Sequence, residues 1–205
     1  MRRRATQAEI VEAAWELVGE QGLAGLSMRD LGERVGMRAQ SVYSYFASKH
    51  EIYDAMFLEG YQAFAICMTD AIGDDHLASD PVGAARTAAH AFVEFCTSDT
   101  ARFQLLFQRT IPGFEPSAES YSVAQHSYQL MAEQLARVGV RDQAALDLWT
   151  AMLTGLASQQ ISNDPGGDRW KQLIDDAVGL LLAGVDISTR HPATTRDTDS
   201  ESEQP

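Results

Sequence analysis

The sequence predicts an all-α protein, with an N-terminal three-helix helix-turn-helix head followed by a larger helical bundle, about nine helices in total. Three observations predict this fold. Apolar residues recur at the spacing of amphipathic helices, no stretch alternates like a strand, and capping residues or Gly and Pro clusters mark the expected helix ends. We expect a head over 1–48, a bundle over 49–189, and a disordered acidic tail over 190–205, where apolar residues are almost absent.

The head begins with an amphipathic helix. Thr6 and Glu9 form a capping-box pattern, so we expect the helix to start there. Upstream, Arg2-Arg3-Arg4 is the densest basic cluster, and two interpretations stay open: an arm that touches DNA, or a solvated, disordered terminus. No apolar run follows these arginines, so we expect no signal peptide. An apolar stripe at helical spacing should cover the core of the head: Ile10, Ala13, Ala14, Leu17 and Val18.

Residues 26–50 have the pattern of two short helices joined by a tight turn. Ser27 can cap the first helix together with Asp30, and Gly36 favours the left-handed residue that ends it. In the second helix, Val42 and Phe46 lie four residues apart and should face the core. A helix-turn-helix reads DNA by placing its second helix in the major groove.

This organisation resembles the TetR family of one-component transcriptional repressors. The resemblance is carried by Leu-Ser-Met-Arg-Asp-Leu at 26–31, Val-Gly-Met at 35–37 and Ser-Val-Tyr-Ser-Tyr-Phe-Ala-Ser-Lys at 41–49, and it extends over about 6–58. It implies a ligand-responsive repressor that binds a palindromic double-stranded DNA operator as a homodimer. Two positions depart from the family or vary within it. Tyr45 replaces a common His, and the triplet Arg38-Ala39-Gln40 is variable, so no relative supplies the operator sequence.

The polar residues of this segment are candidates for contacts with DNA. Arg pairs best with guanine, Gln with adenine, and a small apolar side chain with the thymine methyl group. We therefore expect base contacts from Arg38, Ala39, Gln40 and Ser44. Phosphate contacts, which position the protein without reading sequence, are expected from a second set: Ser27, Arg29, Ser41, Tyr43, Tyr45 and Lys49.

Beyond the head, the segments between the predicted turns and loops are all predicted to be helical. Ser48 caps a long helix, Asp80-Pro81 opens the next in the favoured arrangement, and the cluster Asn163–Gly167 marks a turn. Pro112-Gly113 and Pro116 mark a loop. The expected helices cover 49–72, 81–97, 99–109, 117–138, 142–161 and 168–188.

The last two helices carry more apolar surface than one protomer should need. The resemblance implies that they pair with their symmetry mates in a four-helix interface of a twofold dimer. The alternative is that these residues complete the core of the monomer. The candidate interface residues are Leu148, Met152, Gly155, Leu156, Gln159, Leu173, Ile174, Ala177 and Leu181.

Aromatic residues and methionines crowd the middle helices. For any one of them, ordinary core packing is the simpler interpretation, and the pocket is implied by the resemblance. That pocket would hold a small apolar or amphipathic inducer, with no cofactor. Polar groups could come from His90, Gln104, Gln108, Gln125 or His126. The candidate pocket residues are Phe64, Met68, Phe92, Phe95, Phe103, Phe107, Tyr121, Gln125, Tyr128, Trp149 and Met152.

The formal net charge is -13, but it is unevenly spread. Residues 1–50 hold seven Lys or Arg against six Asp or Glu, so the negative charge lies in the bundle. An acidic body repels phosphate and can suppress non-specific DNA binding while the head docks locally. With two cysteines, Cys67 and Cys96, the chain lacks a disulfide framework and zinc spacing, as expected of buried thiols in a reducing cytoplasm.

Other classes of function find little support. No apolar run is long enough to predict a membrane span, and no nucleophile elbow, P-loop or dinucleotide fingerprint predicts an enzyme. His90 and Glu94 lie four residues apart, but a third metal ligand is not evident. The remaining alternative is a helical small-molecule-binding or scaffold dimer without operator-specific DNA binding.

Overall fold

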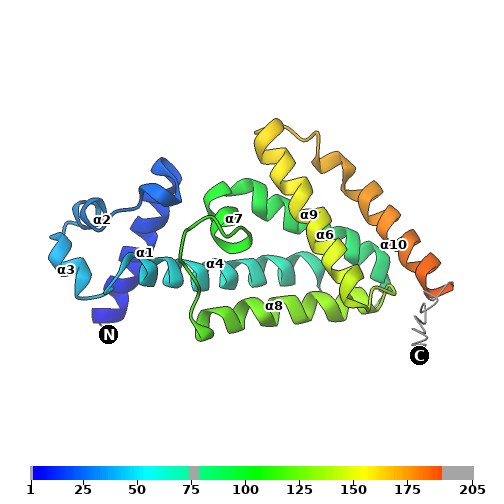
Figure 1. Ribbon diagram of the computed structural model, residues 1–205, viewed down its shortest axis with the longest axis horizontal. Helices are drawn as coiled ribbons and strands as arrows, with labels where there is room; N and C mark the ends of the chain where they lie inside the picture. Colours follow the sequence, from blue (N-terminus) through cyan, green and yellow to red (C-terminus); the bar gives the residue numbers. More distant parts are fainter. Residues whose placement is uncertain (1, 74–78, 191–205) are drawn as a thin grey trace, which may run out of the picture.

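A computed structural model describes the backbone of residues 2–73 and 79–190, and the side chains of residues 6–73 and 79–184. Within these ranges the protein has nine α-helices, two short 3-10 helices and no strand, which confirms the predicted all-α fold (Figure 1). The predicted tail, beyond Arg190, lies outside the described residues. No helix in the described part of the chain is both long and apolar enough to cross a membrane.

The head consists of α1 (Arg2–Gln21), the 3-10 helix η1 (Leu23–Gly25), α2 (Met28–Arg34) and α3 (Ala39–Tyr43). The predicted stripe of α1 is confirmed, since all five of its residues are buried in the core of the head. The predicted cap at Thr6 is wrong, because the helix already begins at Arg2. Arg2–Arg4 therefore belong to the backbone of α1, although their side chains lie outside the described part.

Helix α4 (Lys49–Ile72) connects the head to the body. Ser48 caps it as predicted, with its Oγ accepting the Glu51 N–H at 3.2 Å. Near its start, Ile52 and Met56 are fully buried in the core of the head, whereas Phe64 packs against body aromatics further along. Figure 1 shows α4 running out of the head and along the body. One continuous helix thus links the two cores.

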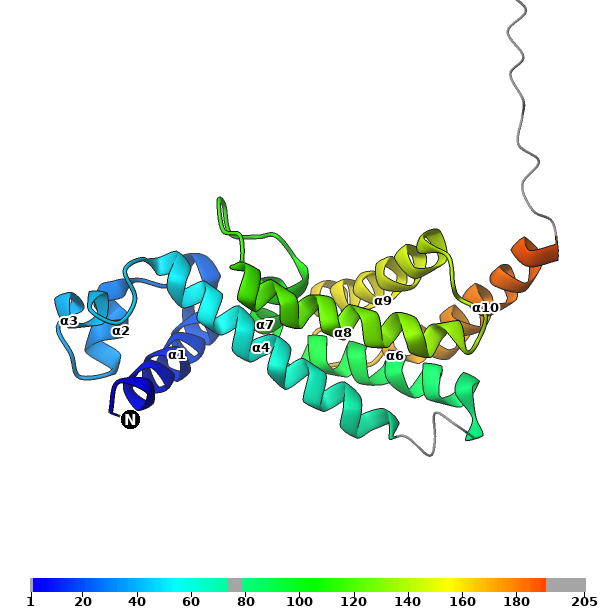
Figure 2. The same ribbon diagram turned by 90° about the horizontal axis from the view of Figure 1, so that it is seen from below.

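The body contains α6 (Pro81–Ser98), α7 (Thr100–Phe107), α8 (Ala118–Ala136), α9 (Gln143–Asn163), the 3-10 helix η2 (Lys171–Leu173) and α10 (Ile174–Arg190). Helix α4 packs against α6 and α8, while α6 also packs against α9. Helix α10 lies along α6 and α9 on the side away from α8 (Figures 1 and 2). Capping side chains start these helices, among them Asp80, Asp99, Ser117 and Asp142.

The last helix starts later than predicted, at Ile174 instead of about 168. The side chain of Gln160, which is buried, accepts the Trp170 N–H at 2.9 Å, and the Asp164 carboxylate accepts the Arg169 N–H at 2.9 Å. The Arg169 N–H holds the pKa of Asp164 below its usual value. These tertiary contacts keep 164–170 in a turn, so α-helix forms only after η2.

Candidate functional site

The turn between α2 and α3 is built from three local features. Ser27 Oγ accepts the Asp30 N–H at 3.1 Å, which confirms the predicted cap of α2. Gly36 has a φ of 69°, the left-handed conformation expected at a helix end. Gly32 brings the two helices together, because a Cβ there would lie 2.8 Å from the carbonyl oxygen of Met37. The sequence patterns above did not single out Gly32, although a glycine inside a short amphipathic helix was a usable signal.

Helix α2 is fixed against α1 by ion pairs. The Arg34 guanidinium donates to Glu16 at 3.1 Å and to Glu20 at 2.7 Å. The bond to Arg34 lowers the pKa of Glu20, and the two carboxylates raise the pKa of Arg34. Gln7 adds a link from α1 to the residues after α3, since its Nε2 donates to the Tyr45 carbonyl at 3.3 Å.

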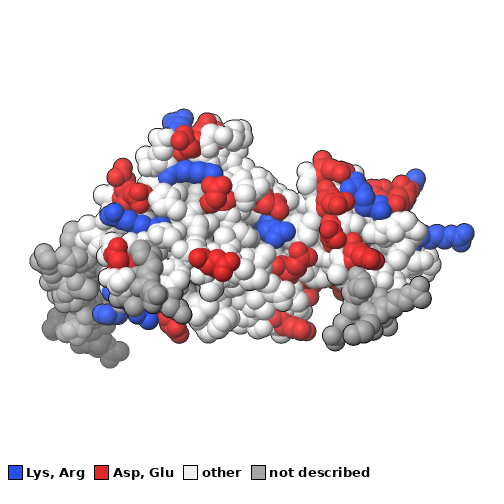
Figure 3. All heavy atoms as spheres, turned by 180° about the vertical axis from the view of Figure 1, so that it is seen from behind, with Lys and Arg blue, Asp and Glu red and all other residues white. Residues whose placement is uncertain are grey.

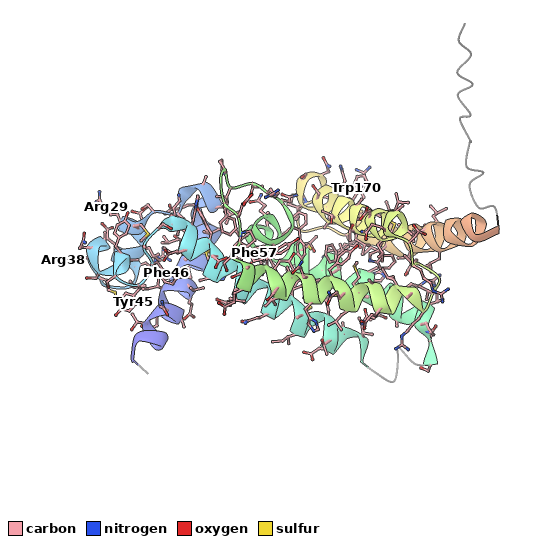
Figure 4. The ribbon with its side chains drawn as sticks, turned by 60° about the horizontal axis from the view of Figure 1, so that its bottom comes forward. Arg29, Arg38, Tyr45, Phe46, Phe57 and Trp170 are labelled. Atoms are coloured by element: carbon pink, nitrogen blue, oxygen red, sulfur yellow. The ribbon has the colours of Figure 1, made fainter. Side chains whose placement is uncertain are left out.

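Helix α3 buries one side and presents the other to solvent. Val42 is fully buried, whereas Arg38, Gln40, Ser41 and Tyr43 are exposed. Figure 4 shows Arg38 and Arg29 projecting from the end of the molecule farthest from α10. The helix ends at Tyr43, so it is shorter than predicted. Ser44 and Tyr45 lie in the turn that follows, although the Phe46 N–H still reaches the Val42 carbonyl at 3.0 Å.

Several candidate phosphate ligands also make contacts within the head. The Lys49 ammonium donates to the Leu26 carbonyl at 2.7 Å, so it ties the start of α4 to the segment before α2. An ammonium has three donor hydrogens, which leaves two for other acceptors. Arg29 pairs with Glu33 on the surface, at 3.1 Å. Ser27, Ala39, Tyr45 and Lys49 are half-buried, whereas Arg29 is exposed.

Charge is distributed as the sequence predicts. Figure 3 shows acidic side chains over both the body and the head, with a basic side chain reaching out from the far end of the head. Arg29 and Arg38 are exposed cations of the α2–α3 unit, and no other Lys or Arg lies between positions 28 and 44 except Arg34, which is paired with α1. Arg29 is itself paired with Glu33, so the head presents a nearly neutral surface from which Arg38 projects, ahead of an acidic body.

A cavity of about 550 Å³ lies in the body between α4, α6, α7, α8 and α9. Its aromatic walls are packed edge to face, with ring centres 5.3 Å apart for Phe64 and Phe107, and 5.1 Å apart for Phe92 and Phe107. Six of the eleven predicted pocket residues line it: Phe64, Met68, Phe92, Phe107, Tyr128 and Trp149.

The other five predicted pocket residues do not line the cavity. Phe103 is buried in the body core, and Phe95 packs behind Phe64. Tyr121 and Gln125 are exposed on the outer side of α8, while Met152 lies against the core on another side of α9. The four remaining candidate polar groups, His90, Gln104, Gln108 and His126, are also absent from the walls. Helical periodicity identifies the inner face of a helix, but it does not show whether a residue on that face lines the cavity or packs in the body core.

Apart from Tyr128 and Trp149, the residues that bring polar groups to the cavity were not among the predicted residues. They are Tyr61, Thr69, Ser127, Gln134, Thr150 and Thr154. Thr150 and Thr154 lie four residues apart, beside the buried residues Trp149 and Leu153. That spacing was a signal for polar groups facing inward from α9.

Helices α9 and α10 leave an apolar surface open to solvent in the protomer. Leu148 is 63% exposed, Leu180 76% and Leu173 42%. Leu180 was not among the candidate interface residues. Of the candidates besides Leu148 and Leu173, Gly155 and Gln159 are exposed, and Met152, Leu156, Ala177 and Leu181 are half-buried. The prediction that Ile174 lies in the dimer interface is wrong. Ile174 is only 1% exposed because it packs in the body core, so it is not available to a partner.

His90 pairs with a residue of α10, and Glu94 pairs with a residue of η2, so the two do not form a site with each other. His90 Nε2 lies 3.3 Å from Asp175, and Glu94 accepts from Lys171 at 2.5 Å. No group of three metal-binding side chains occurs among the residues for which side chains are described. These pairs therefore link η2 and the start of α10 to α6.

A head of this geometry on a helical body defines a helix-turn-helix protein, and comparison with known proteins shows which family the head resembles. Residues 10–56 match the family model described as bacterial regulatory proteins, tetR family. The head of the chain is therefore similar to the DNA-binding head of the TetR family.

Individual relatives agree with this assignment. An HTH-type transcriptional regulator of Mycobacterium tuberculosis is 29% identical over 112 residues, which are 55% of this chain and 47% of that protein. The chain thus matches about half the length of that relative. The class A tetracycline repressor protein of Escherichia coli is 24% identical over 178 residues, 86% of this chain and 78% of the repressor. The structure of FadR from Bacillus subtilis with stearoyl-CoA superposes with a TM-score of 0.65 at 16% identity, covering 86% of this chain and 98% of that one.

Proposed function

We propose that this protein is a DNA-binding transcriptional regulator: a ligand-responsive repressor that binds a palindromic operator as a homodimer. The observation that carries the proposal is the position of α3. Its polar side is exposed at the far end of the molecule, while its apolar residue Val42 is buried in the head. A helix whose only task was to complete the head would not need Arg38, Gln40 and Tyr43 together on the solvent side.

In the proposed complex, α3 lies in the major groove and α2 crosses the DNA backbone. Arg38 reads guanine through O6 and N7, Gln40 reads adenine, and Ala39 contacts a thymine methyl group. Ser44 is the fourth candidate for base contact. Ser27, Arg29, Ser41, Tyr43, Tyr45 and Lys49 bind phosphates. Of these, Lys49 also positions the head, since its ammonium is held by the Leu26 carbonyl.

A dimer would place two heads on successive major grooves, about 34–36 Å apart. The exposed leucines of α9 and α10 support this assembly, because large apolar residues grouped on adjacent helices usually mark an interface. Helices α9 and α10 lie in the body, away from the head (Figure 1). An obligate dimer of this kind buries on the order of 2,000 Å² or more.

The body cavity is the proposed effector site. Two relatives support this proposal: the FadR structure is a complex with stearoyl-CoA, and another relative is a tetracycline repressor protein. In this chain the cavity is lined by α4, the helix that also enters the core of the head. An effector that fits better when the heads are splayed shifts the dimer away from the operator spacing, and it must prefer that state to have any effect.

The proposal is tested by selecting bound sequences from a random DNA pool with the purified full chain. We expect an inverted repeat with half-sites about one helical turn apart. Recovery of no enriched sequence would contradict the proposal and favour a ligand-binding or scaffold dimer.

A further inference from the structure

We infer that the cavity takes an uncharged, ring-containing, mainly apolar molecule with one hydrogen-bonding group, recognised by Gln134 and Thr154. The inference rests on the proposed effector site, and it adds the chemical class of the effector and two residues that select it.

The first observation is the absence of charge. None of the described side chains that line the cavity is Asp, Glu, Lys, Arg or His. A buried ionic group without a partner costs several kcal/mol, because nothing replaces its hydration. A carboxylate, phosphate or ammonium group inside this cavity would be unpaired, so the walls select neutral molecules.

The second observation is the aromatic character of the walls. Tyr61, Phe64, Phe92 and Phe107 form one connected cluster, with ring centres 5.1 to 6.1 Å apart. Trp149 adds a further ring from α9. Aromatic side chains offer edges and faces that pack well against other rings. A volume of about 550 Å³ is in the usual range for sites that hold drug-sized ligands.

The third observation concerns the hydroxyl groups. Most of them are already engaged. Tyr61 donates to the Leu106 carbonyl at 3.2 Å, Ser127 to Val123 at 3.1 Å, and Thr150 to Asp147 at 3.0 Å. Thr69 donates to the Ala65 carbonyl at 2.9 Å, and Gln143 donates to the Tyr128 hydroxyl at 2.7 Å.

Gln134 and Thr154 are different, because within the described part of the chain neither side chain makes a hydrogen bond. Both line the cavity, from α8 and α9 respectively. An amide or a hydroxyl group can donate to and accept from a neutral polar group, such as an alcohol, a ketone or an ester. In an otherwise apolar site, these two groups would fix the orientation of the ligand.

Three pyrene derivatives of one skeleton test this inference: 1-pyrenebutanol, 1-pyrenebutyrate and 1-butylpyrene. Their affinities for the full chain without DNA are measured by equilibrium dialysis at pH 7. We expect the alcohol to bind at least about tenfold more tightly than the carboxylate. It should also bind about fivefold more tightly than the hydrocarbon, the equivalent of one hydrogen bond.

Variants assign the polar contact. Gln134→Leu and Thr154→Val should lower the affinity for the alcohol toward that for the hydrocarbon and leave the hydrocarbon unchanged. Gln125→Leu, on the exposed side of the same helix as Gln134, is the matched control and should change neither. Ala88→Phe, which fills part of the cavity wall, should weaken all three probes and so locate the site.

The inference is overturned if the carboxylate binds as tightly as the alcohol, if no probe binds, or if both polar variants leave the alcohol unaffected. The first comparison uses the wild-type chain and does not depend on any variant folding. DNA binding is measured separately on the same preparation. Loss of DNA binding with the predicted ranking of probes would count against the proposed function alone, whereas operator binding with a reversed ranking would count against this inference alone.

Discussion

The guanidinium carbon of Arg102 lies 4.6 Å from the centre of the Trp15 ring. Arg102 belongs to α7 in the body and Trp15 to α1 in the head, so this stack is a second connection between the two parts beside α4. The Asp99 carboxylate lies 3.3 Å from Arg102 Nε and holds the guanidinium in place. Helix α7 also contributes Leu106 and Phe107 to the cavity, so the helix that carries Arg102 also lines the proposed effector site.

A double-mutant cycle tests the stack. Arg102→Met and Trp15→Leu should each lower the free energy of unfolding, and their effects should be less than additive by about 0.5–2 kcal/mol. The measurement is urea unfolding of the two single variants and the double variant. Arg109, which is 84% exposed, provides the control. Arg109→Met combined with Trp15→Leu should be additive, and a coupling of equal size there would contradict a specific stack.

Gly32→Ala should destabilise the head by about 1–3 kcal/mol, because the new Cβ meets the Met37 carbonyl oxygen at 2.8 Å and backbone atoms cannot move aside cheaply. Gly19→Ala is the matched control. Gly19 lies in α1, and a Cβ added there would have open space around it to 4 Å, so alanine should stabilise the helix by up to about 1 kcal/mol. Denaturant melts of both variants check the prediction, and equal effects of the same sign would refute it.

Acid should weaken the contact between α1 and α2. The Arg34 hydrogen bond lowers the pKa of Glu20 in the folded state, so its stabilising contribution is complete above the unfolded pKa and is lost as the pH falls through the folded pKa. Between about pH 5 and pH 3, wild-type stability should therefore fall more steeply than that of Glu20→Gln. Thermal melts at several pH values measure the two slopes. Glu12→Gln, on an exposed position of α1, should retain the wild-type slope.

Leu148→Glu should convert the dimer to monomers without unfolding the protomer, because a charge would be placed in the proposed apolar interface. Ile66→Glu is a close control, since Ile66 on α4 is also 63% exposed but lies outside the α9–α10 surface. Sedimentation velocity gives the mass of each species, and circular dichroism checks the fold. A monomeric wild type, or dissociation by both variants alike, would show that α9 and α10 do not form the interface.

Local signals in the sequence predicted most of the helices. Ser27, Ser48 and Asp80 each cap a helix through a backbone N–H three residues away, and such contacts depend only on neighbouring residues. The stripe of α1 was predictable for the same reason, because one face of a helix is fixed by its own periodicity. Thr6 shows the limit: a capping pattern does not stop a helix when the preceding residues can continue it.

Features that depend on distant residues were not predictable. The late start of α10 follows from contacts of Gln160 and Asp164 with 169–170. Ile174 has the same apolar character as Leu173, yet the first is buried and the second is 42% exposed, because the packing of α10 on α9 decides which one faces the core. The cavity shows the same limit, since Tyr121 and Gln125 fall on the outer side of α8 while Gln134 lines the wall.

The most direct test of the account is the effect of Arg38→Ala on DNA binding at fixed salt. Affinities of the wild type and the variant are measured for the selected inverted repeat and for a scrambled duplex of the same length. We expect the variant to lose about 1–3 kcal/mol per head on the repeat and little on the scrambled DNA, because Arg38 reads bases. Lys49→Ala is the comparison, and it should weaken binding to both duplexes alike. Equal losses on both duplexes for Arg38→Ala, or no loss on either, would contradict the claim that the exposed side of α3 reads DNA sequence.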